Sequence, residues 1–290
     1  MDEHLINKIT DISETLLIPL YSRAAESQTE NPILIDTKAI DITKEMNNIF
    51  KNSDSRLHQA LAKGKVRGKL GKKLNVTLCL RTRKFDEYCH SFLEKYPGGT
   101  IVELGCGLST RFSRIDNKKL TWFDLDFPEV IDIRKVFFKE SDRYHFIASS
   151  VLDFKWMENV FNKNKKVLFL AEGLLMYLHE NEVKDLILKL QQTFPGCELV
   201  CEVANTFVIK MLKRKVWKKK FQRDFHLGKD ALFYFGISDS SDFEKWNQGI
   251  TFLDDWTYFD DKEKKLGWIN ILGRSKKLSK TQWIVHYLLE

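Results

Sequence analysis

The sequence contains little cysteine and proline and no long apolar run, and each shortage excludes a class of protein. Its 290 residues include 5 cysteines and 5 prolines. The cysteines form no CxxC pair and have no histidine at ligand spacing, so we expect reduced core thiols and no metal site. No apolar run reaches membrane-spanning length, and the first six residues carry acids where a secretory leader carries lysines. We therefore expect a soluble, cytoplasmic protein with no membrane partner.

A large excess of one sign of charge is also missing. The 47 lysines and arginines exceed the 40 acidic residues by a formal charge of +7, which is modest for a nucleic-acid binder of this length. Residues 63–73 combine basic residues with three glycines and no aromatic residue, which favours a flexible solvated loop. Residues 210–223 are typical of a solvated basic helix face. We expect no nucleic-acid partner.

Short apolar runs alternate with amphipathic helical patterns, and this alternation predicts an α/β protein with a mostly parallel sheet. Right-handed crossovers are expected between the strands, with the last strand as an antiparallel member. The expected strands are residues 100–104, 120–126, 144–148, 166–171, 197–203 and 280–289. The expected helices include residues 13–26, which Pro19 would kink or interrupt, and residues 41–50, 75–96 and 183–194.

We expect two regions with different roles. Residues 1–96 would form helices that cap a ligand cleft, and residues 97–290 would form the core that binds the ligand. Within that core, residues 230–261 are rich in aromatic and acidic residues and break the alternation of strands and helices. We expect an insertion at residues 205–262 that covers a substrate pocket, the acceptor site.

The most informative stretch is Thr100-Ile-Val-Glu-Leu-Gly-Cys-Gly-Leu-Ser109, an apolar strand that ends in an acid and two glycines. Gly105 and Gly107 permit positive φ and the close approach of a ligand, as in the first βα turn of nucleotide-binding units. Thr110 stands where a dinucleotide-binding motif has its third glycine, so the motif is incomplete for NAD. S-adenosylmethionine needs carboxylates for its ammonium and ribose instead, and Glu103 with a later acid would supply them. Taken alone, the motif also fits an ordinary strand and turn.

Two acids compete for the ribose. Asp126 follows Glu103 at close to the ~20-residue offset of ribose-binding acids in such units. Asp124 lies on the same strand face, and only one of the two can sit at the ribose edge. Glu172 ends a later apolar run, where it would either cap the next helix or face the ligand.

Four motifs occur in order along the chain: Arg81-Thr-Arg-Lys-Phe-Asp86, Glu103-Leu-Gly-Cys-Gly-Leu-Ser-Thr-Arg111, Phe123-Asp-Leu-Asp-Phe-Pro-Glu-Val130 and Ala171-Glu-Gly-Leu-Leu-Met-Tyr-Leu178. Together they resemble the leucine carboxyl methyltransferase family, in its branch of polyketide and small-molecule O-methyltransferases. The resemblance implies a Rossmann-like class I sheet of seven strands and S-adenosylmethionine as the methyl donor. It implies donor contacts at Arg81, Gly105, Asp126, Ser150, Val151 and Glu172. The chain departs from the family at Ser109, where many members have Asp.

The implied reaction moves a methyl group to a hydroxyl or carboxyl oxygen of a small molecule. A carboxylate acceptor needs no base, whereas a phenol does, and the sequence offers Tyr177, His179 and His226 without favouring any. One alternative is a protein C-terminal carboxyl methyltransferase that uses Arg111 and residues 210–223 to bind a peptide carboxylate. Others are a non-catalytic Rossmann-like protein that binds a nucleotide ligand and an RNA-associated protein. The sequence indicates neither the acceptor nor the oligomeric state.

Arg81 falls on the apolar stripe of the helix expected at residues 75–96. A guanidinium group on an apolar face needs an anion. Periodicity alone favours a buried ion pair with a protein carboxylate. The resemblance favours the methionine carboxylate of the donor, bound through a bidentate fork.

Overall fold

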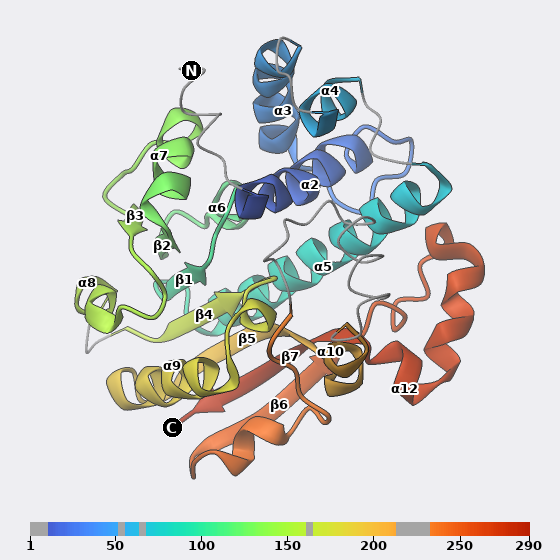
Figure 1. Cartoon of the computed structure of the whole chain (residues 1–290). Coiled ribbons are helices and arrows are strands. Elements are labelled where there is room, and N and C mark those ends of the chain that lie inside the picture. The colour runs from blue at the N-terminus through green and yellow to red at the C-terminus, as the bar shows by residue number, and fades with distance from the viewer. Residues whose placement is uncertain (1–10, 52–55, 64–67, 161–164, 213–232) are drawn as a thin grey trace.

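The structure is a computed structural model that describes residues 11–51, 56–63, 68–160, 165–212 and 233–290 (Figure 1). Its centre is a seven-stranded sheet with the strand order β3-β2-β1-β4-β5-β7-β6. The strands are β1 Thr100–Leu104, β2 Thr121–Asp126, β3 Tyr144–Ala148, β4 Val167–Ala171, β5 Cys197–Ala204, β6 Ile250–Trp256 and β7 Gln282–Leu289. Strands β1 to β5 are parallel, and β7 is antiparallel to both β5 and β6. The predicted fold class and the antiparallel last strand are confirmed.

Helices surround the sheet. The helices are α2 Asp11–Glu26, α3 Thr37–Phe50, α4 Arg56–Ala62, α5 Gly68–Lys95, α6 Arg111–Ile115, α7 Pro128–Phe137, α8 Met157–Val160, α9 Glu180–Thr193, α10 Thr206–Leu212 and α12 Lys276–Ser279. Short 3₁₀ helices are η1 Phe154–Trp156, η2 Leu175–Tyr177, η3 Asp242–Lys245 and η4 Lys264–Arg274. In Figure 1, α2, α3, α4 and α5 gather together, whereas α9 lies apart from them beyond β4.

The two faces of the sheet bury separate apolar clusters, because successive strand residues point to opposite sides. Ile101 of β1 packs with residues of α2, α3 and α5, whereas its neighbour Val102 packs with residues of α8 and α9. The strand order reverses between β1 and β4. Ligands of open α/β sheets bind at such a reversal, beyond the carboxyl ends of the strands.

Three helix predictions were wrong at their boundaries. The helix expected from residue 75 begins at Gly68, so residues 68–73 are helical and not a loop. Their lysines are good helix formers, and Lys73 Nζ donates to the carbonyl oxygen of Lys265, which anchors this turn against η4. Helix α3 begins at Thr37, where Asp36 caps it by accepting a hydrogen bond from the Ala39 N–H at 2.9 Å. Helix α2 begins at Asp11 instead of residue 13, and it contains Pro19 without being interrupted there.

Strand β6 was not predicted, because its residues mix apolar and acidic side chains. It pairs with β7 at the edge of the sheet, with a register shift between Phe252 and Asp254. An edge strand with one solvated face carries acids that hide its apolar alternation. Part of the segment expected as an insertion is therefore a member of the sheet.

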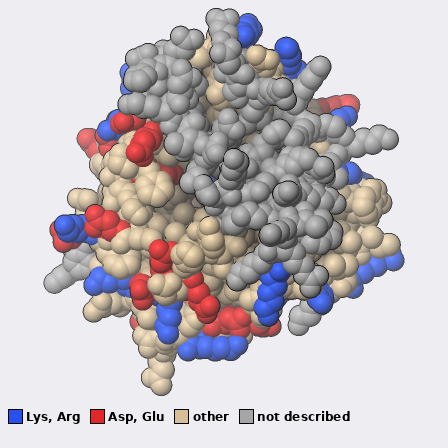
Figure 2. All heavy atoms as spheres, in the orientation of Figure 1, with Lys and Arg blue, Asp and Glu red and all other residues tan. Residues whose placement is uncertain are grey.

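One face of the described surface carries charges of both signs. On the face shown in Figure 2, lysine and arginine side chains alternate with aspartate and glutamate and do not form one basic patch. No helix in the described ranges is long and apolar enough to cross a bilayer. Among the same residues, no group of three or more His, Cys, Asp or Glu side chains is arranged to hold a metal ion.

Candidate functional site

The glycine turn after β1 has the backbone that the sequence predicted. Gly105 has φ of 64° and Gly107 has φ of 50°, in the left-handed region that favours glycine. A Cβ on Gly105 would lie 3.0 Å from Leu174 Cδ1, and one on Gly107 would lie 3.0 Å from Leu16 Cδ2. The backbone conformation therefore favours glycine at both positions, and a side chain at either would also displace a neighbouring leucine.

A cavity of about 340 Å³ opens beside this turn, at the strand-order reversal. Its walls come from α2, α5, the glycine turn, the segment after β4 and three residues of the C-terminal region. The lining residues are Leu16, Ile18, Pro19, Arg23, Leu74, Thr77, Leu78, Arg81, Glu103, Gly105, Cys106, Gly107, Leu108, Ser109, Glu172, Gly173, Met176, Tyr177, Phe233, Tyr258 and Gln282. The structure thus brings together five of the eight predicted donor-contacting residues.

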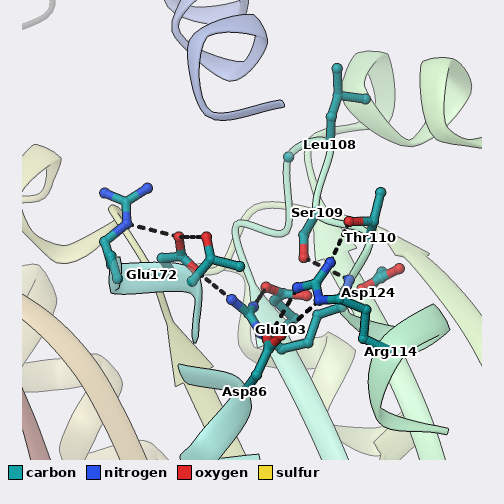
Figure 3. Close-up of polar contacts among 12 residues, drawn as sticks. Asp86, Glu103, Leu108, Ser109, Thr110, Arg114, Asp124 and Glu172 are labelled. Carbon is teal, nitrogen blue, oxygen red and sulfur yellow. Dashed lines mark hydrogen bonds and ion pairs between the residues drawn. The ribbon is translucent and has the colours of Figure 1, made fainter. Parts of the chain in front are cut away.

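Arg111 lies beneath this cavity as the centre of a buried charge network. Its guanidinium group donates to Asp86 at 2.8 Å and also to Glu103 and Glu172. Figure 3 shows these three carboxylates converging from different elements. Because the Arg111 side chain is 1% exposed and has three carboxylate partners, it is not available to bind a peptide carboxylate.

Glu103 retains an unused acceptor. Its Oε1 pairs with Arg111, but the buried Oε2 has no hydrogen-bond partner in the described structure. The pKa of Glu103 is raised to about 7, because burial and the carboxylates of Asp124 and Glu172 together outweigh the opposing effect of Arg111. Glu103 lines the cavity, and its raised pKa and unpaired oxygen are typical of a site for a hydrogen-bond donor or a cation.

Arg81 forms the buried ion pair that periodicity predicted, and it also lines the cavity. Its Nε donates to Glu172 Oε1 at 2.8 Å, and its Nη1 donates to Glu202 Oε2 at 2.9 Å. Burial would raise the pKa of Glu172, but the guanidinium groups of Arg81 and Arg111 outweigh it and lower that pKa to about 2. In the described contacts, Nη2 is the guanidinium nitrogen of Arg81 left without a carboxylate.

The two acids of β2 have different surroundings. Asp124 is fully buried, forms an ion pair with Arg134 and accepts from Trp122 Nε1 at 2.9 Å. Asp126 ends the strand, where its Oδ2 accepts from the Gly107 N–H at 2.7 Å. Asp124 is therefore committed to the core, whereas Asp126 lies beside the glycine turn.

The remaining predicted residues lie at the neighbouring strand end. Ser150 and Val151 follow β3, whose last residue pairs with Asp126. Val151 is buried, and its carbonyl oxygen accepts from Trp156 Nε1 at 3.0 Å. Asp126, Ser150 and Val151 do not line the cavity beside the glycine turn.

The three candidate bases differ in whether they line the cavity. Tyr177 lines the cavity, and burial raises its pKa to about 12. His179 precedes α9, its ring packs against Tyr234, and it does not line the cavity. His226 lies outside the described residues.

Three further polar residues at this end of the sheet were missed. Glu202 is completely buried in β5, and it accepts hydrogen bonds from Tyr258 and Gln282 as well as from Arg81. An acid inside an apolar strand was the available signal, because such a position needs buried donors.

Comparison with known proteins identifies relatives for this architecture. The family model for leucine carboxyl methyltransferases matches residues 17–191. The chain is 26% identical over 254 residues to the tetracenomycin polyketide synthesis O-methyltransferase TcmP of Streptomyces glaucescens, covering 87% of this chain and 85% of that relative. It is 28% identical over 203 residues to an S-adenosyl-L-methionine-dependent methyltransferase of Gibberella zeae, covering 64% and 62% of the two chains.

Solved structures share the fold. A DUF574 family protein from Streptomyces avermitilis superposes with a TM-score of 0.57 at 8% identity, covering 86% of this chain and 97% of that one. A protein from Thermobifida fusca superposes with a TM-score of 0.53 at 12% identity, covering 86% and 94%. At such low identity these likenesses show the fold alone.

We predict different stability losses for the two acids of β2. Asp124→Asn removes the counter-charge of the buried Arg134 and should lower the free energy of unfolding by about 3 kcal/mol. Asp126→Asn keeps one acceptor oxygen and should lower it by about 1 kcal/mol. Urea unfolding at pH 7 measures both, and equal losses would contradict the division of roles between the two acids.

Proposed function

The chain belongs to the leucine carboxyl methyltransferase family, and from that premise we propose that it transfers a methyl group from S-adenosylmethionine to a hydroxyl or carboxyl oxygen of a polyketide-like small molecule. The observation that carries this proposal is the cavity beside the glycine turn, which has buried charges of both signs in its wall. The donor supplies an electrophilic methyl group on its sulfonium sulfur. The protein supplies binding, alignment and exclusion of water.

The residues present fit the two charged ends of the donor's amino acid. Glu103 Oε2 is a buried acceptor without a partner, which suits an ammonium group. Arg81 Nη2 has no carboxylate partner in the described structure and suits the donor's carboxylate. Because Glu172 already occupies Arg81 Nε, a fork through Nε and Nη2 is not open while that ion pair holds. In this assignment, Glu172 holds the guanidinium groups of Arg81 and Arg111 in place.

The adenosine would lie along the ends of β1, β2 and β3. Gly105 and Gly107 allow close approach to the turn, and each Asp126 oxygen retains a lone pair for a ribose hydroxyl beside its backbone donor. We assign Ser150 and Val151 to the adenine edge because they follow the next strand of the sheet. This placement requires the space beside Gly107, which Leu16 of α2 now borders.

The acceptor would lie against the aromatic part of the cavity wall. Met176, Tyr177 and Phe233 belong to this part, and the rings of Tyr177 and Phe233 meet edge to face with centroids 5.3 Å apart. An aromatic wall of this kind suits a planar apolar acceptor. A pKa of about 12 keeps Tyr177 neutral near pH 7, so it would donate a hydrogen bond rather than act as a phenolate base.

The region assignments follow from these placements. Helices α2 and α5 contribute to the cavity wall, which supports a capping role for residues 1–96. Phe233 and Tyr258 support an acceptor-covering role for residues 205–262. The boundary at residue 97 and the cytoplasmic location stay predictions.

Acceptor screening tests the proposal. Purified protein and S-adenosylmethionine are incubated with phenolic and carboxylic aromatic acceptors, and release of S-adenosylhomocysteine is measured. Turnover with a small aromatic acceptor is expected. Donor binding without turnover on any acceptor would favour the non-catalytic alternative, and turnover only on peptide C-termini would favour the protein carboxyl methyltransferase.

We predict that donor affinity depends on pH through Glu103. The ordinary glutamate pKa is about 4.3, so a pKa of about 7 means that the folded protein holds this proton up to neutral pH. An ammonium ligand needs the ionised form, so the donor Kd should be about tenfold higher at pH 6 than at pH 8.

Isothermal titration calorimetry in buffers of different ionisation enthalpy measures this Kd and the proton released on binding. Glu103→Gln should bind more weakly at pH 8 and lose most of the pH dependence. A parent protein with the same donor Kd at both pH values would contradict the role of Glu103.

We predict that Arg81→Lys weakens donor binding more than it lowers the free energy of unfolding. Arg81→Ala would leave Glu172 and Glu202 without their shared counter-charge and lower the free energy of unfolding by about 3 to 5 kcal/mol. Arg81→Lys keeps the charge but loses the planar guanidinium, so the donor Kd should rise about tenfold with a smaller stability loss.

Calorimetry and thermal unfolding without donor provide the two measurements. The matched control is Arg83→Lys, because Arg83 lies on the same helix, pairs with Asp261 at 2.7 Å and does not line the cavity. A folded Arg81→Lys protein with the parent's Kd would rule out the donor contact.

A further inference from the structure

Glu202 has an environment that stability alone does not explain. It is an acid in the middle of the sheet, completely buried between neighbouring strands. Its Oε1 accepts from the Tyr258 hydroxyl and from Gln282 Nε2 at 2.7 Å, and its Oε2 accepts from Arg81 Nη1 at 2.9 Å. A buried ion pair is often no more stabilising than apolar side chains of the same volume. The cluster is better explained by the geometry that it imposes.

That geometry acts on Arg81. Glu172 at the end of β4 holds Nε, and Glu202 on the adjacent β5 holds Nη1. Two carboxylates from paired strands fix both the position and the plane of the guanidinium group. Without Glu202, the planar guanidinium group could turn about the single bond between Cδ and Nε, and Nη2 would lose its fixed direction.

Tyr258 and Gln282 fix Glu202 in turn. They come from the segment after β6 and from the start of β7, and both line the same cavity as Arg81. Burial raises the pKa of Glu202, and Arg81 opposes that shift, so the ionised form depends on this guanidinium partner. The four side chains form one hydrogen-bonded cluster at the cavity wall.

We propose that Glu202 is a positioning residue that orients Arg81 toward the carboxylate of the methyl donor. This inference rests on the proposed function. Glu202 does not touch the donor in this assignment, and its effect passes through Arg81. It should therefore alter donor affinity only while Arg81 is present.

The test measures donor Kd by calorimetry for the parent, Glu202→Gln, Arg81→Lys and the double variant. Glu202→Gln is isosteric and should raise the donor Kd about tenfold, the equivalent of one charge-assisted hydrogen bond. In the Arg81→Lys background the same change should raise it less than about twofold, because the two effects act through one group. Equal effects in both backgrounds would overturn the proposal.

Glu198→Gln is the matched control. Glu198 lies on the same strand and face and is also buried, but it pairs with His286 at 2.8 Å and does not line the cavity. This variant should keep the parent's donor Kd whatever its melting temperature. A Glu202→Gln protein that melts earlier but binds donor like the parent would show a structural role only and refute the positioning role.

Two further outcomes distinguish failure of this inference from failure of the proposed function. A folded parent that does not bind S-adenosylmethionine would refute the proposed function itself, whereas a binding parent with an unaffected Glu202→Gln variant would refute the inference alone.

If Glu202→Gln does not fold, Tyr258→Phe provides a second test, because it removes one hydrogen bond to Glu202 without changing charge. It should raise the donor Kd about threefold, roughly half the free energy of one hydrogen bond, and an unchanged Kd would overturn the proposal.

Discussion

The shared guanidinium group of Arg111 is the interaction on which the site depends. It is the common counter-charge of Asp86 on α5, Glu103 at the end of β1 and Glu172 after β4. Removing one partner of a buried ion pair typically costs several kcal/mol, although the intact pair adds little net stability. The network therefore selects one arrangement of the covering helix and two central strands. The cavity exists because these elements can meet in few other ways without leaving a carboxylate unpaired.

Two other buried arginines hold the backbone of the glycine turn in place. Arg134 of α7 donates to the carbonyl oxygen of Gly107 at 2.7 Å, and Arg23 of α2 donates to that of Leu108 at 2.8 Å. These two hydrogen bonds fix the carbonyl groups of the turn. Because these partners come from the protein, the turn is formed before any ligand binds, and less ordering is required on binding.

Local features of this chain were predictable, and pairings across the sheet were not. The run ending in Gly105 and Gly107 predicted strand, turn and positive φ, since all three depend on neighbouring residues. The stripe position of Arg81 predicted a buried anion partner but could not name Glu202, which lies on a strand far along the chain. Strand β6 was missed because an edge strand carries acids, and Gly68 was missed as a helix start because contacts with η4 outweighed its propensity.

The ion pairs of Arg81 and Arg111 together leave the cavity wall with an excess of negative charge. Glu103, Glu172 and Glu202 surround two guanidinium groups, those of Arg81 and Arg111, so this inner cluster has one more carboxylate than counter-charge. The excess negative charge does not affect the pKa values of these carboxylates equally. Glu172 has both guanidinium groups beside it and a pKa of about 2, whereas Glu103 shares Arg111 with two other acids and has a pKa of about 7. The proton that Glu103 holds near neutral pH thus stands in for a missing cation at the cavity wall, where an ammonium group would restore the balance.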